Sequence, residues 1–554
     1  MPTIDVSYKD LCNLIGKKLS AEELENAVLY AKGEIDSIDN DAIKIDIKDT
    51  NRPDLWSAEG ICREIRGRVT KDVGLPDYSV GKSSVVVNVD KKVSKVRSLT
   101  VCAVVKKLKM NENILSQMIQ LQEKVSGTFG RNRKEVAIGV YDLNKITPPI
   151  KYTTVKPDGI KFVPLEFKDK LTPREILNKH PKGKEFGHLL KDCEEYPIFI
   201  DSANNVLSLP PIINSDYTGK VTEKTTDLFI ECSGFRLKFL LPALNTIVAA
   251  LADRGGKLET VKIVYPDTVL NTPDFTPKKT FVDVDYVNKI SGLNLNGKKI
   301  CQLLERARYK TILKGKRIEL LYPAYRQDIM HKRDVVEDVI ISFGYNKIEP
   351  LMPKLPVIGS ESELEIFSNK ISEVLIGLGL QEIMSYTLTS KKNLFEKMNL
   401  KNKRIVEIEN PVSMNRGVFR SWVLPSLLEF LSKNKHVDYP QNIFEIGDAV
   451  NIDEKRETGT VNERKLAVVL TDNTIGYEEI SSHLDALMKN LGIDYKLRAT
   501  EHGSFIPGRV AKILINNNSI GIIGEINPLV LERWNLEKPV AGFEMSIDML
   551  KVYK

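Results

Sequence analysis

Seven short apolar runs with strand character follow one another after Pro356, with few helical segments between them. They lie at residues 382–387, 404–409, 442–446, 465–470, 511–515, 519–523 and 540–547. Parallel neighbours need long crossover connections, so a succession of this kind favours an antiparallel sheet flanked by helices. An amphipathic helix at 361–378 precedes them, with apolar residues on one stripe.

Two linker-like stretches, residues 76–84 and 350–356, divide the rest of the chain. A length of 554 residues corresponds to about three to five domains. We expect an α+β multidomain protein. Its predicted parts are an N-terminal α/β domain at 1–80, a second α/β domain at 84–266, a small domain at 267–350 and the sheet domain at 357–554. The small domain shows two helices, a strand pair and a third helix, an order typical of a winged helix.

The composition excludes several classes of protein. No apolar run reaches the ~18–20 residues that span a bilayer, and the N-terminus lacks the pattern of a signal peptide. Six scattered cysteines without a C-x-x-C pair argue against a disulfide scaffold or a cysteine zinc site. We therefore expect a cytoplasmic protein with no membrane contact. A net charge of +7 permits nucleic-acid binding but equally fits a mixed solvated surface.

The usual motifs of nucleotide and hydrolase sites are missing. The sequence contains no G-x-G-x-x-G, G-x-x-x-x-G-K-[ST], H-E-x-x-H or G-x-S-x-G. No Rossmann, P-loop, zincin or α/β-hydrolase mechanism is therefore indicated, and candidate sites must come from looser constellations.

The first constellation is acidic. Asp334, Glu337 and Asp338 would share one face of a helix that begins near Asp334, and Asp328 precedes them in a loop. Four carboxylates without cysteine form the all-oxygen ligand set that suits Mg²⁺. The alternative is an acid-rich first helical turn that complements the helix dipole.

Two further constellations lie at strand ends. The run Leu207–Ser215 places Asn214 and Ser215 after a Pro-Pro turn, where an amide and a hydroxyl could hold a small polar ligand. The alternative is an ordinary turn in which both side chains bond to the backbone. Arg420 could bind a phosphate or carboxylate, or it could be a surface arginine at a strand-to-helix junction.

Taken together and in order, these segments resemble the β-subunit family of phenylalanyl-tRNA synthetase, in its archaeal and eukaryotic length. The resemblance covers essentially the whole chain. Its motifs are Asn51-Arg52-Pro53-Asp54-Leu55 with Glu59-Gly60, Leu207 to Ser215, Tyr325-Arg326-Gln327-Asp328 through Glu337-Asp338 with Phe343-Gly344-Tyr345-Asn346, and Phe419-Arg420-Ser421 with Leu424-Pro425-Ser426-Leu427-Leu428.

The resemblance implies a subunit of an α2β2 ligase that joins phenylalanine to tRNA-Phe, converting ATP to AMP and diphosphate. The aminoacylation site would lie on the α subunit, and the sheet domain here would be class II in shape without activating amino acid. Arg420 would then be structural. The chain would supply scaffold, tRNA binding and an editing domain at 84–266. It would lack the bacterial C-terminal anticodon-binding domain.

The resemblance also implies that Asp328, Asp334, Glu337 and Asp338 are Mg²⁺ ligands, because all four match the spacing of the family's ligands. The editing domain would hydrolyse Tyr-tRNA-Phe. A pocket that accepts tyrosine and refuses phenylalanine must hydrogen-bond the phenolic hydroxyl. Asn214, Ser215 and Glu231 are the polar candidates on this stretch, with Leu207 and Leu209 beside the ring, and no residue is assigned as catalytic.

Two alternatives stay open at the level of sequence. One is a free-standing hydrolase of mischarged tRNA, and the other is a non-enzymatic RNA-binding scaffold. The helix at 361–378 and the large sheet domain favour an obligate partner, because a deacylase needs neither.

Overall fold

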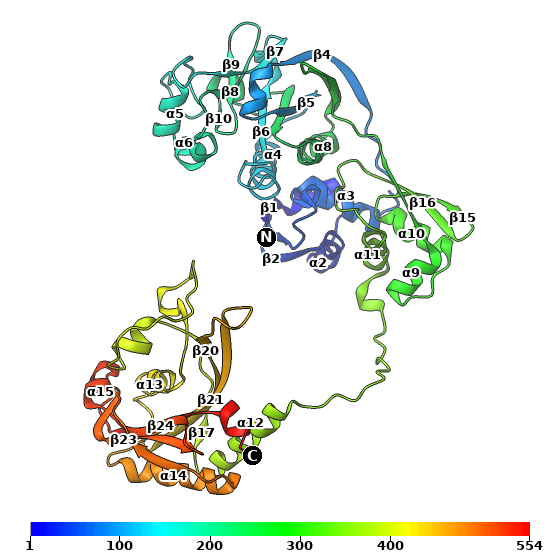
Figure 1. The fold of residues 1–554 in the computed structure, drawn as a ribbon. Helices are drawn as coiled ribbons and strands as arrows, with labels where there is room; N and C mark the ends of the chain where they lie inside the picture. The colour runs from blue at the N-terminus through cyan, green and yellow to red at the C-terminus, as the bar shows by residue number, and fades with distance from the viewer. Residues whose placement is uncertain (1, 554) are drawn as a thin grey trace. The chain divides into compact units, whose positions relative to one another are not determined.

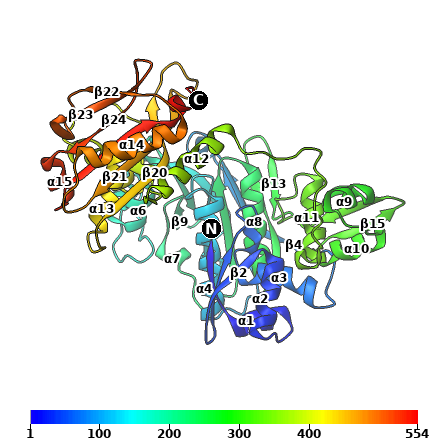
Figure 2. The ribbon, with the colours of Figure 1, turned by 90° about the horizontal axis from the view of Figure 1, so that it is seen from below.

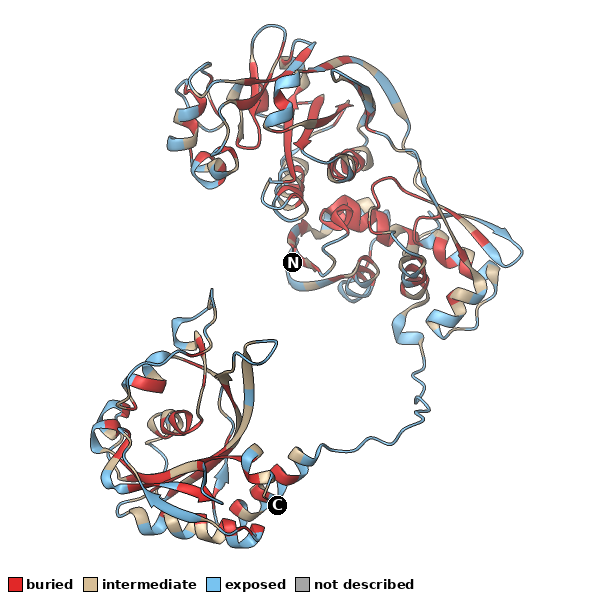
Figure 3. Cartoon of the chain, viewed as in Figure 1, coloured by how far each residue is buried: buried red, intermediate tan, exposed pale blue. Residues whose placement is uncertain are grey.

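The computed structural model describes residues 2–553 and divides the chain into two compact units, Met1–Leu351 and Met352–Lys554 (Figure 1). Both units mix helices and sheets, so the chain is an α+β multidomain protein. Residues 349–362 are exposed along their whole length (Figure 3). No helix among the described residues is long and apolar enough to cross a membrane.

The first part of the chain forms a three-stranded antiparallel sheet in the order β1-β3-β2, covered by helices. Its elements are β1 (Thr3–Ser7), α1 (Tyr8–Ile15), α2 (Ala21–Val28), β2 (Gly33–Asp39), β3 (Ala42–Ile47) and α3 (Ala58–Val69). Alternate residues of β3 are buried, as its apolar periodicity predicts. Ser20 and Glu23 form the capping box that their spacing indicates at the start of α2. Helix α3 is buried over most of its length (Figure 3).

A ten-stranded sheet follows, in the order β10-β9-β8-β7-β4-β12-β5-β11-β6, with β13 paired to β12. Its strands are β4 (Val80–Val89), β5 (Leu99–Lys106), β6 (Val136–Asp142), β7 (Ile150–Val155), β8 (Tyr196–Ile200), β9 (Val206–Leu209), β10 (Ile213–Asn214), β11 (Leu228–Gly234), β12 (Lys257–Val264) and β13 (Val269–Thr272). β4 is parallel to both β12 and β7, and the other pairs are antiparallel. Residues 80–84, expected in a linker, instead belong to β4 because Val80 pairs with Leu258 of β12.

Five helices accompany this sheet: α4 (Glu112–Lys124), α5 (Pro173–Lys179), α6 (Pro181–Phe186), α7 (Asp216–Gly219) and α8 (Leu237–Asp253). α8 is buried along most of its length. Its apolar side chains join those of β5 and β11 in one continuous core.

The last part of the first unit has the predicted order of elements. It contains β14 (Lys278–Asp283), α9 (Val284–Ser291), α10 (Gly297–Arg306), β15 (Lys310–Lys314), β16 (Arg317–Tyr322) and α11 (Lys332–Phe343). The sheet order is β14-β16-β15, so β14 adds a strand that the sequence analysis missed. The three helices and the β15–β16 hairpin lie together in both views (Figures 1 and 2).

Buried ion pairs connect the first part of the chain to this small helical part. Arg52, which is 2% exposed, bonds through Nε and Nη2 to Asp54 at 2.9 and 2.8 Å and through Nη2 to Glu64 at 3.2 Å. A buried charge is tolerated only when it is paired and hydrogen-bonded, and the two-pronged guanidinium achieves this here.

Arg326 repeats the arrangement with the same sequence spacing. It bonds to Asp328 at 2.8 and 2.5 Å and to Asp338 at 2.9 Å. Asp328 Oδ1 also lies 3.7 Å from Arg52 Nε, so the two arginine clusters meet. The two parts of the first unit are therefore joined by a shared set of buried charges.

The second unit holds a seven-stranded sheet in the order β17-β20-β21-β25-β24-β23-β22. Its strands are β17 (Gln381–Glu382), β20 (Gln441–Ile452), β21 (Thr460–Thr471), β22 (Lys496–Ala499), β23 (Phe505–Ile515), β24 (Asn518–Ile526) and β25 (Val540–Ser546). Only the β17–β20 pair is parallel. The expected strand at 404–409 is wrong, because that segment makes a single bridge, Glu407 with Val418, and β18 (Leu388–Thr389) pairs with β19 (Val418–Phe419) instead.

Helices cover both faces of this sheet. They are α12 (Glu363–Gly377), α13 (Leu424–Lys433), α14 (Tyr477–Leu491), α15 (Pro528–Trp534) and α16 (Ile547–Lys551). α12, α14 and α16 contribute to one apolar core, and α13 and α15 contribute to another. The amphipathic stripe of α12 faces the first core through Phe367, Ile371 and Leu375, as predicted.

Replacing Arg52 by methionine should lower the free energy of unfolding by about 3–5 kcal/mol, because Asp54 would stay buried without its cation and Glu64 would keep only Arg68. Urea denaturation measures this loss. The control is Arg174→Met, which breaks an exposed pair with Asp158 and should cost less than about 1 kcal/mol. Equal losses from the two substitutions would contradict the structural role of the buried pairs.

Candidate functional site

A cavity of about 510 Å³ opens beside the end of the ten-stranded sheet, between β6, β11, the β9–β10 turn and the helices α4 and α6. We call it the β11 cavity. Apolar and polar side chains both line it. The apolar residues include Leu115, Met118, Ala137, Ile138, Val140 and Ile212, and the polar ones include Ser208, Asn214, Glu231, Arg133, Glu166, Lys182 and Glu185. A hollow that combines apolar walls with convergent polar groups is the usual form of a small-ligand site.

Glu231 is the most unusual of these side chains. It lies on β11, which is paired on both sides by β5 and β6, and it is 2% exposed. Oε1 lies 3.2 Å from the Tyr141 hydroxyl, which is also 2.8 Å from Ser208 Oγ. Oε2 is buried and has no hydrogen-bond partner among residues 2–553.

Burial raises the pKa of Glu231 to about 7, because removal from water disfavours the charged form, although the Arg97 guanidinium and the hydroxyls of Tyr141 and Ser233 oppose the shift. The side chain thus changes charge close to neutral pH. A strongly shifted carboxyl in a cavity is typical of functional sites.

Asn214 is held at the edge of the same cavity. It lies in β10 opposite Ser208 of β9, and its Nδ2 donates to the Val140 carbonyl at 3.3 Å. Gly219 packs directly against it, since a Cβ at position 219 would lie 2.4 Å from the Cβ of Asn214. The glycine therefore allows the close approach that fixes Asn214.

Ser215, Leu207 and Leu209, the other three predicted residues, do not line the β11 cavity. Leu209 is fully buried among apolar residues. Ser215 is buried and caps α7, where its Oγ accepts from the Thr218 amide at 3.3 Å. Leu207 is fully buried in the core, because successive side chains of a strand point to opposite faces. Ser208, which the sequence analysis did not select, lines the cavity instead. The sequence feature that could have identified Ser208 is its position as a single polar residue between two leucines, both of which are buried.

The four carboxylates of the acidic constellation are bound to several different partners. Asp328 and Asp338 both bond to Arg326, and the arginines beside Asp328 hold the pKa of its carboxyl well below the usual range despite burial. Their oxygens are therefore already used to neutralise a buried cation.

The remaining two acids face other groups. Asp334 Oδ2 accepts from the amides of Met330 and His331 at 2.8 and 2.6 Å, which is the helix-capping alternative. Glu337 Oε1 bonds to Lys32 Nζ at 3.0 Å. Within the described part of the chain, no group of three or more His, Cys, Asp or Glu is arranged to hold a metal ion. The four carboxylates thus have the oxygen chemistry that suits Mg²⁺ but do not converge on one point.

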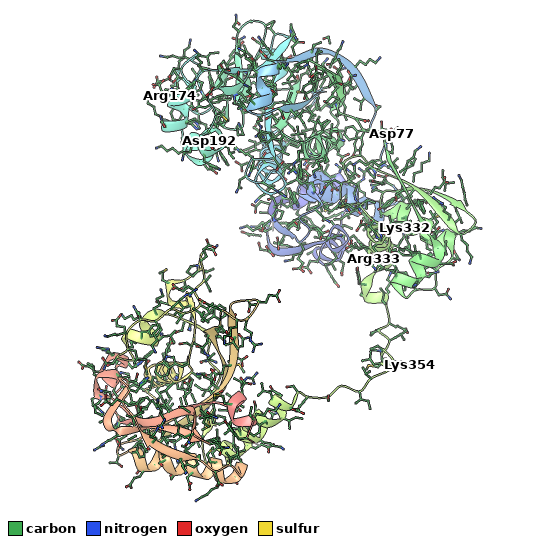
Figure 4. All side chains as sticks on the ribbon, viewed as in Figure 1. Asp77, Arg174, Asp192, Lys332, Arg333 and Lys354 are labelled. Carbon is green, nitrogen blue, oxygen red and sulfur yellow. The ribbon has the colours of Figure 1, made fainter. Side chains whose placement is uncertain are left out.

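Basic residues also stand beside these acids, since Lys332 and Arg333 lie at the start of α11 (Figure 4). Lys332 bonds to Asp283 at 3.0 Å. The segment therefore combines both signs of charge.

Arg420 is buried rather than at the surface. Its Nη1 lies 2.7 Å from Glu445 Oε1, with both side chains 2% exposed, and its Nε donates to the Asp448 carbonyl at 2.9 Å. These contacts occupy the guanidinium and agree with a structural role.

A second hollow, of about 770 Å³, lies in the second unit beside the start of α14. Its opposed charges are paired, with Arg509 Nη1 2.7 Å from Glu525 Oε2, while Glu525 Oε1 accepts from the Tyr477 amide at 2.9 Å. Among residues 2–553, no acid of this hollow has a buried oxygen without a hydrogen-bond partner, in contrast to Glu231.

Comparisons with known proteins cover all of these regions. Residues 348–547 match the model of the phenylalanyl tRNA synthetase beta chain CLM domain, 280–345 that of the tRNA synthetase B5 domain and 87–248 that of the B3/4 domain. The β11 cavity and its polar residues lie within the B3/4 match.

Similar proteins extend over the full chain. The phenylalanine–tRNA ligase beta subunit of Pyrococcus abyssi is 52% identical, covering 99% of this chain and all of its own length. That of Methanothrix thermoacetophila is 37% identical over 99% of this chain. A crystallised N-terminal fragment of the Pyrococcus horikoshii subunit is 51% identical, with a TM-score of 0.61, and covers 62% of this chain and all of that fragment.

High identity over nearly the whole length, in agreement with three matched domain models, places the molecule without ambiguity. The chain belongs to the family of phenylalanine–tRNA ligase beta subunits.

Proposed function

We propose that this chain works with an α subunit as a phenylalanine–tRNA ligase, and that the β11 cavity removes tyrosine from mischarged tRNA-Phe. The names of its relatives support the ligase assignment. The observation that carries the editing assignment is the buried, unpartnered Oε2 of Glu231 at the wall of the β11 cavity. A hydrophobic synthetic site rejects one added hydroxyl only weakly, so a second site is needed.

Selection of tyrosine would depend on the phenolic hydroxyl. The apolar walls around Ile138, Val140 and Met118 suit an aromatic ring, and Glu231 would accept the phenolic hydrogen through Oε2. Phenylalanine would leave this oxygen buried and unpaired, which costs about 1–3 kcal/mol or more. Asn214 and Ser208 complete the polar side of the cavity.

The reaction itself is hydrolysis of an ester. A water oxygen adds to the ester carbonyl, the bond between the carbonyl carbon and the ribose oxygen breaks, and the ribose oxygen takes a proton. Tyrosine and free tRNA leave. The Ser208 hydroxyl lies against Tyr141 and has no adjacent base, so we assign no nucleophilic side chain and propose that the cavity positions the water and the ester.

The remaining assignments are also proposals. We propose the four domains at 1–80, 84–266, 267–350 and 357–554, of which the third is winged-helix-like and the fourth class II-like without amino-acid activation. The α2β2 assembly, tRNA-Phe binding and a cytoplasmic location complete this account. A free-standing hydrolase is the second candidate, and the large second unit disfavours it because a deacylase has no use for such a unit.

Magnesium is proposed at the acidic segment around the start of α11. Asp328, Asp334, Glu337 and Asp338 supply the oxygen ligands that Mg²⁺ prefers. Asp334 Oδ1 and Glu337 Oε2 make no hydrogen bond or ion pair with the described residues and are open to an ion, whereas Asp328 and Asp338 are bound to Arg326. Bound Mg²⁺ would supply positive charge that offsets carboxylate repulsion.

Two substitutions test the editing cavity in the assembled ligase. Glu231→Gln should lower hydrolysis of Tyr-tRNA-Phe by about 10-fold, because a charge-assisted hydrogen bond is lost, and Asn214→Leu should do so by filling the cavity. Formation of Phe-tRNA-Phe should stay nearly unchanged. Release of labelled tyrosine from preformed Tyr-tRNA-Phe measures the first activity.

The matched control for these substitutions is Glu166→Gln, because Glu166 is an exposed acid at the rim of the same cavity. It should hydrolyse Tyr-tRNA-Phe as the wild type does. Full deacylation by Glu231→Gln and Asn214→Leu would place editing elsewhere in residues 84–266.

The pKa of Glu231 also predicts a dependence of stability on pH. In the unfolded chain this group titrates near its usual value of 4.5, and in the folded chain near 7, so the folded state binds the extra proton between these values. The protonation of Glu231 makes its full contribution to the free energy of unfolding below about pH 4.5. This contribution is lost as pH rises through 7, which lowers the free energy of unfolding by about 3 kcal/mol. Glu231→Gln should therefore raise the melting temperature relative to wild type more at pH 8 than at pH 5, and an equal difference at both pH values would contradict the buried ionisation.

Mg²⁺ should raise the melting temperature of the wild-type assembly compared with EDTA. Asp334→Asn combined with Glu337→Gln should abolish this increment, because the two open ligands are lost. Glu363→Gln, which alters an exposed acid at the start of α12, serves as control and should keep the increment. Identical wild-type melting curves in Mg²⁺ and EDTA would leave the segment as a helix cap alone.

A further inference from the structure

A left-handed turn forms part of the wall of the β11 cavity. Arg131, Asn132 and Arg133 have φ values of 52°, 52° and 64°, directly after the π-helical turn Val125–Phe129. Three consecutive non-glycine residues in this region carry a conformational cost, because the side chain of an L-residue crowds its own backbone there. Such strain persists only where the surroundings impose it, and it clusters at functional sites.

A buried arginine holds this turn in place. Arg97, 3% exposed, donates through Nη2 to the Arg133 carbonyl at 3.0 Å and through Nη1 to the Lys134 carbonyl at 3.3 Å. Its Nε donates to Ser233 Oγ at 3.1 Å, on the same strand as Glu231. The backbone of the strained turn is therefore fastened to the strand that carries the candidate recognition residue.

Hydrogen bonds fix the side chain of Arg133 at the cavity, but only one of its three guanidinium nitrogens takes part in them. Nη1 donates to the carbonyls of Pro211 and Ile212 at 3.1 and 2.8 Å, and the group lies 4.1 Å from the centre of the Phe186 ring. Nε and Nη2 have no hydrogen-bond partner among the residues described. No carboxylate there lies within 4.0 Å of Arg133, since Glu185 and Glu123 act on it only at longer range.

Other cations near this cavity are used differently. Lys182 is paired with Glu185 at 3.0 Å. Lys220 is exposed, and no contact of its ammonium group fixes it. Arg133 thus combines a fixed position, a place on the cavity wall and a guanidinium that has no carboxylate within 4.0 Å among the described residues.

We propose that Arg133 binds a phosphate of the 3′-terminal nucleotides of aminoacyl-tRNA when the aminoacyl group occupies the β11 cavity. The inference rests on the proposed editing function. With tyrosine inside and its ester at the mouth, the ribose and the phosphates of the terminal nucleotides must lie at the rim. Nε and Nη2 of one guanidinium match two oxygens of a phosphate.

The test uses two substrates in the assembled ligase. Tyr-tRNA-Phe carries the terminal phosphates, and 3′-O-tyrosyl-adenosine carries the same ester without a phosphate. Arg133→Gln should raise the KM for Tyr-tRNA-Phe about 10-fold, with kcat little changed, and should leave hydrolysis of the tyrosyl-adenosine at the wild-type rate. The dependence of tRNA affinity on salt should weaken by about one phosphate contact. Arg133→Lys should recover part of the affinity.

Arg131→Gln is the matched control, because Arg131 belongs to the same left-handed turn but does not line the cavity. It should act as wild type on both substrates. Equal losses by Arg133→Gln on both substrates would show that Arg133 only supports the cavity wall, and no loss on either would show that it contacts no phosphate, so each result overturns the inference. A wild-type ligase that hydrolyses neither substrate would instead refute the proposed editing function and the inference with it.

Discussion

Buried arginines in the first unit bind together segments that are far apart in sequence. Arg52 and Arg326 lie where the N-terminal sheet meets the small helical part, and each is matched by two carboxylates. Arg97 connects the left-handed turn to β11. A guanidinium stays charged at any ordinary pH, so each burial forces its neighbours to supply acceptors. At the β11 cavity, the acceptors that Arg97 needs come from the left-handed turn and from β11, so Arg97 fixes these two parts of the wall relative to each other.

The same requirement separates the two acidic sites. Near Arg326 the carboxylates are used for structure, so Asp328 stays ionised and is not available as a free ligand. In the β11 cavity, by contrast, the buried arginine does not hydrogen-bond to the carboxyl. Glu231 lies deep in the sheet, and Arg97 donates its hydrogen bonds to backbone carbonyls and to Ser233 instead. A carboxyl with one unused oxygen can recognise a hydroxyl, which is the discrimination that a tyrosine-editing site needs.

Periodic segments could be predicted from the sequence, and contacts across the fold could not. The helix at 361–378 and the capping box at Ser20 agree with the structure because local patterns determine them. The strand at 404–409 fails because its apolar run finds almost no partner. Glu231 and Asn214, two polar residues that the sequence singled out, both line one cavity. Ser208 depends on strand register and the turn at Arg133 depends on Arg97, and neither leaves a strong local signal.

The central claim is that a buried carboxyl selects the phenolic hydroxyl, and binding of non-hydrolysable analogues tests it most directly. Isothermal titration at pH 8 would compare 3′-amide-linked tyrosyl-adenosine and phenylalanyl-adenosine on the assembled ligase, with its synthetic site blocked by a phenylalanyl-adenylate analogue. The account predicts that the tyrosyl compound binds at least about 10-fold more tightly and that Glu231→Gln removes most of this preference. Equal affinity of the two analogues for the wild-type protein would contradict it.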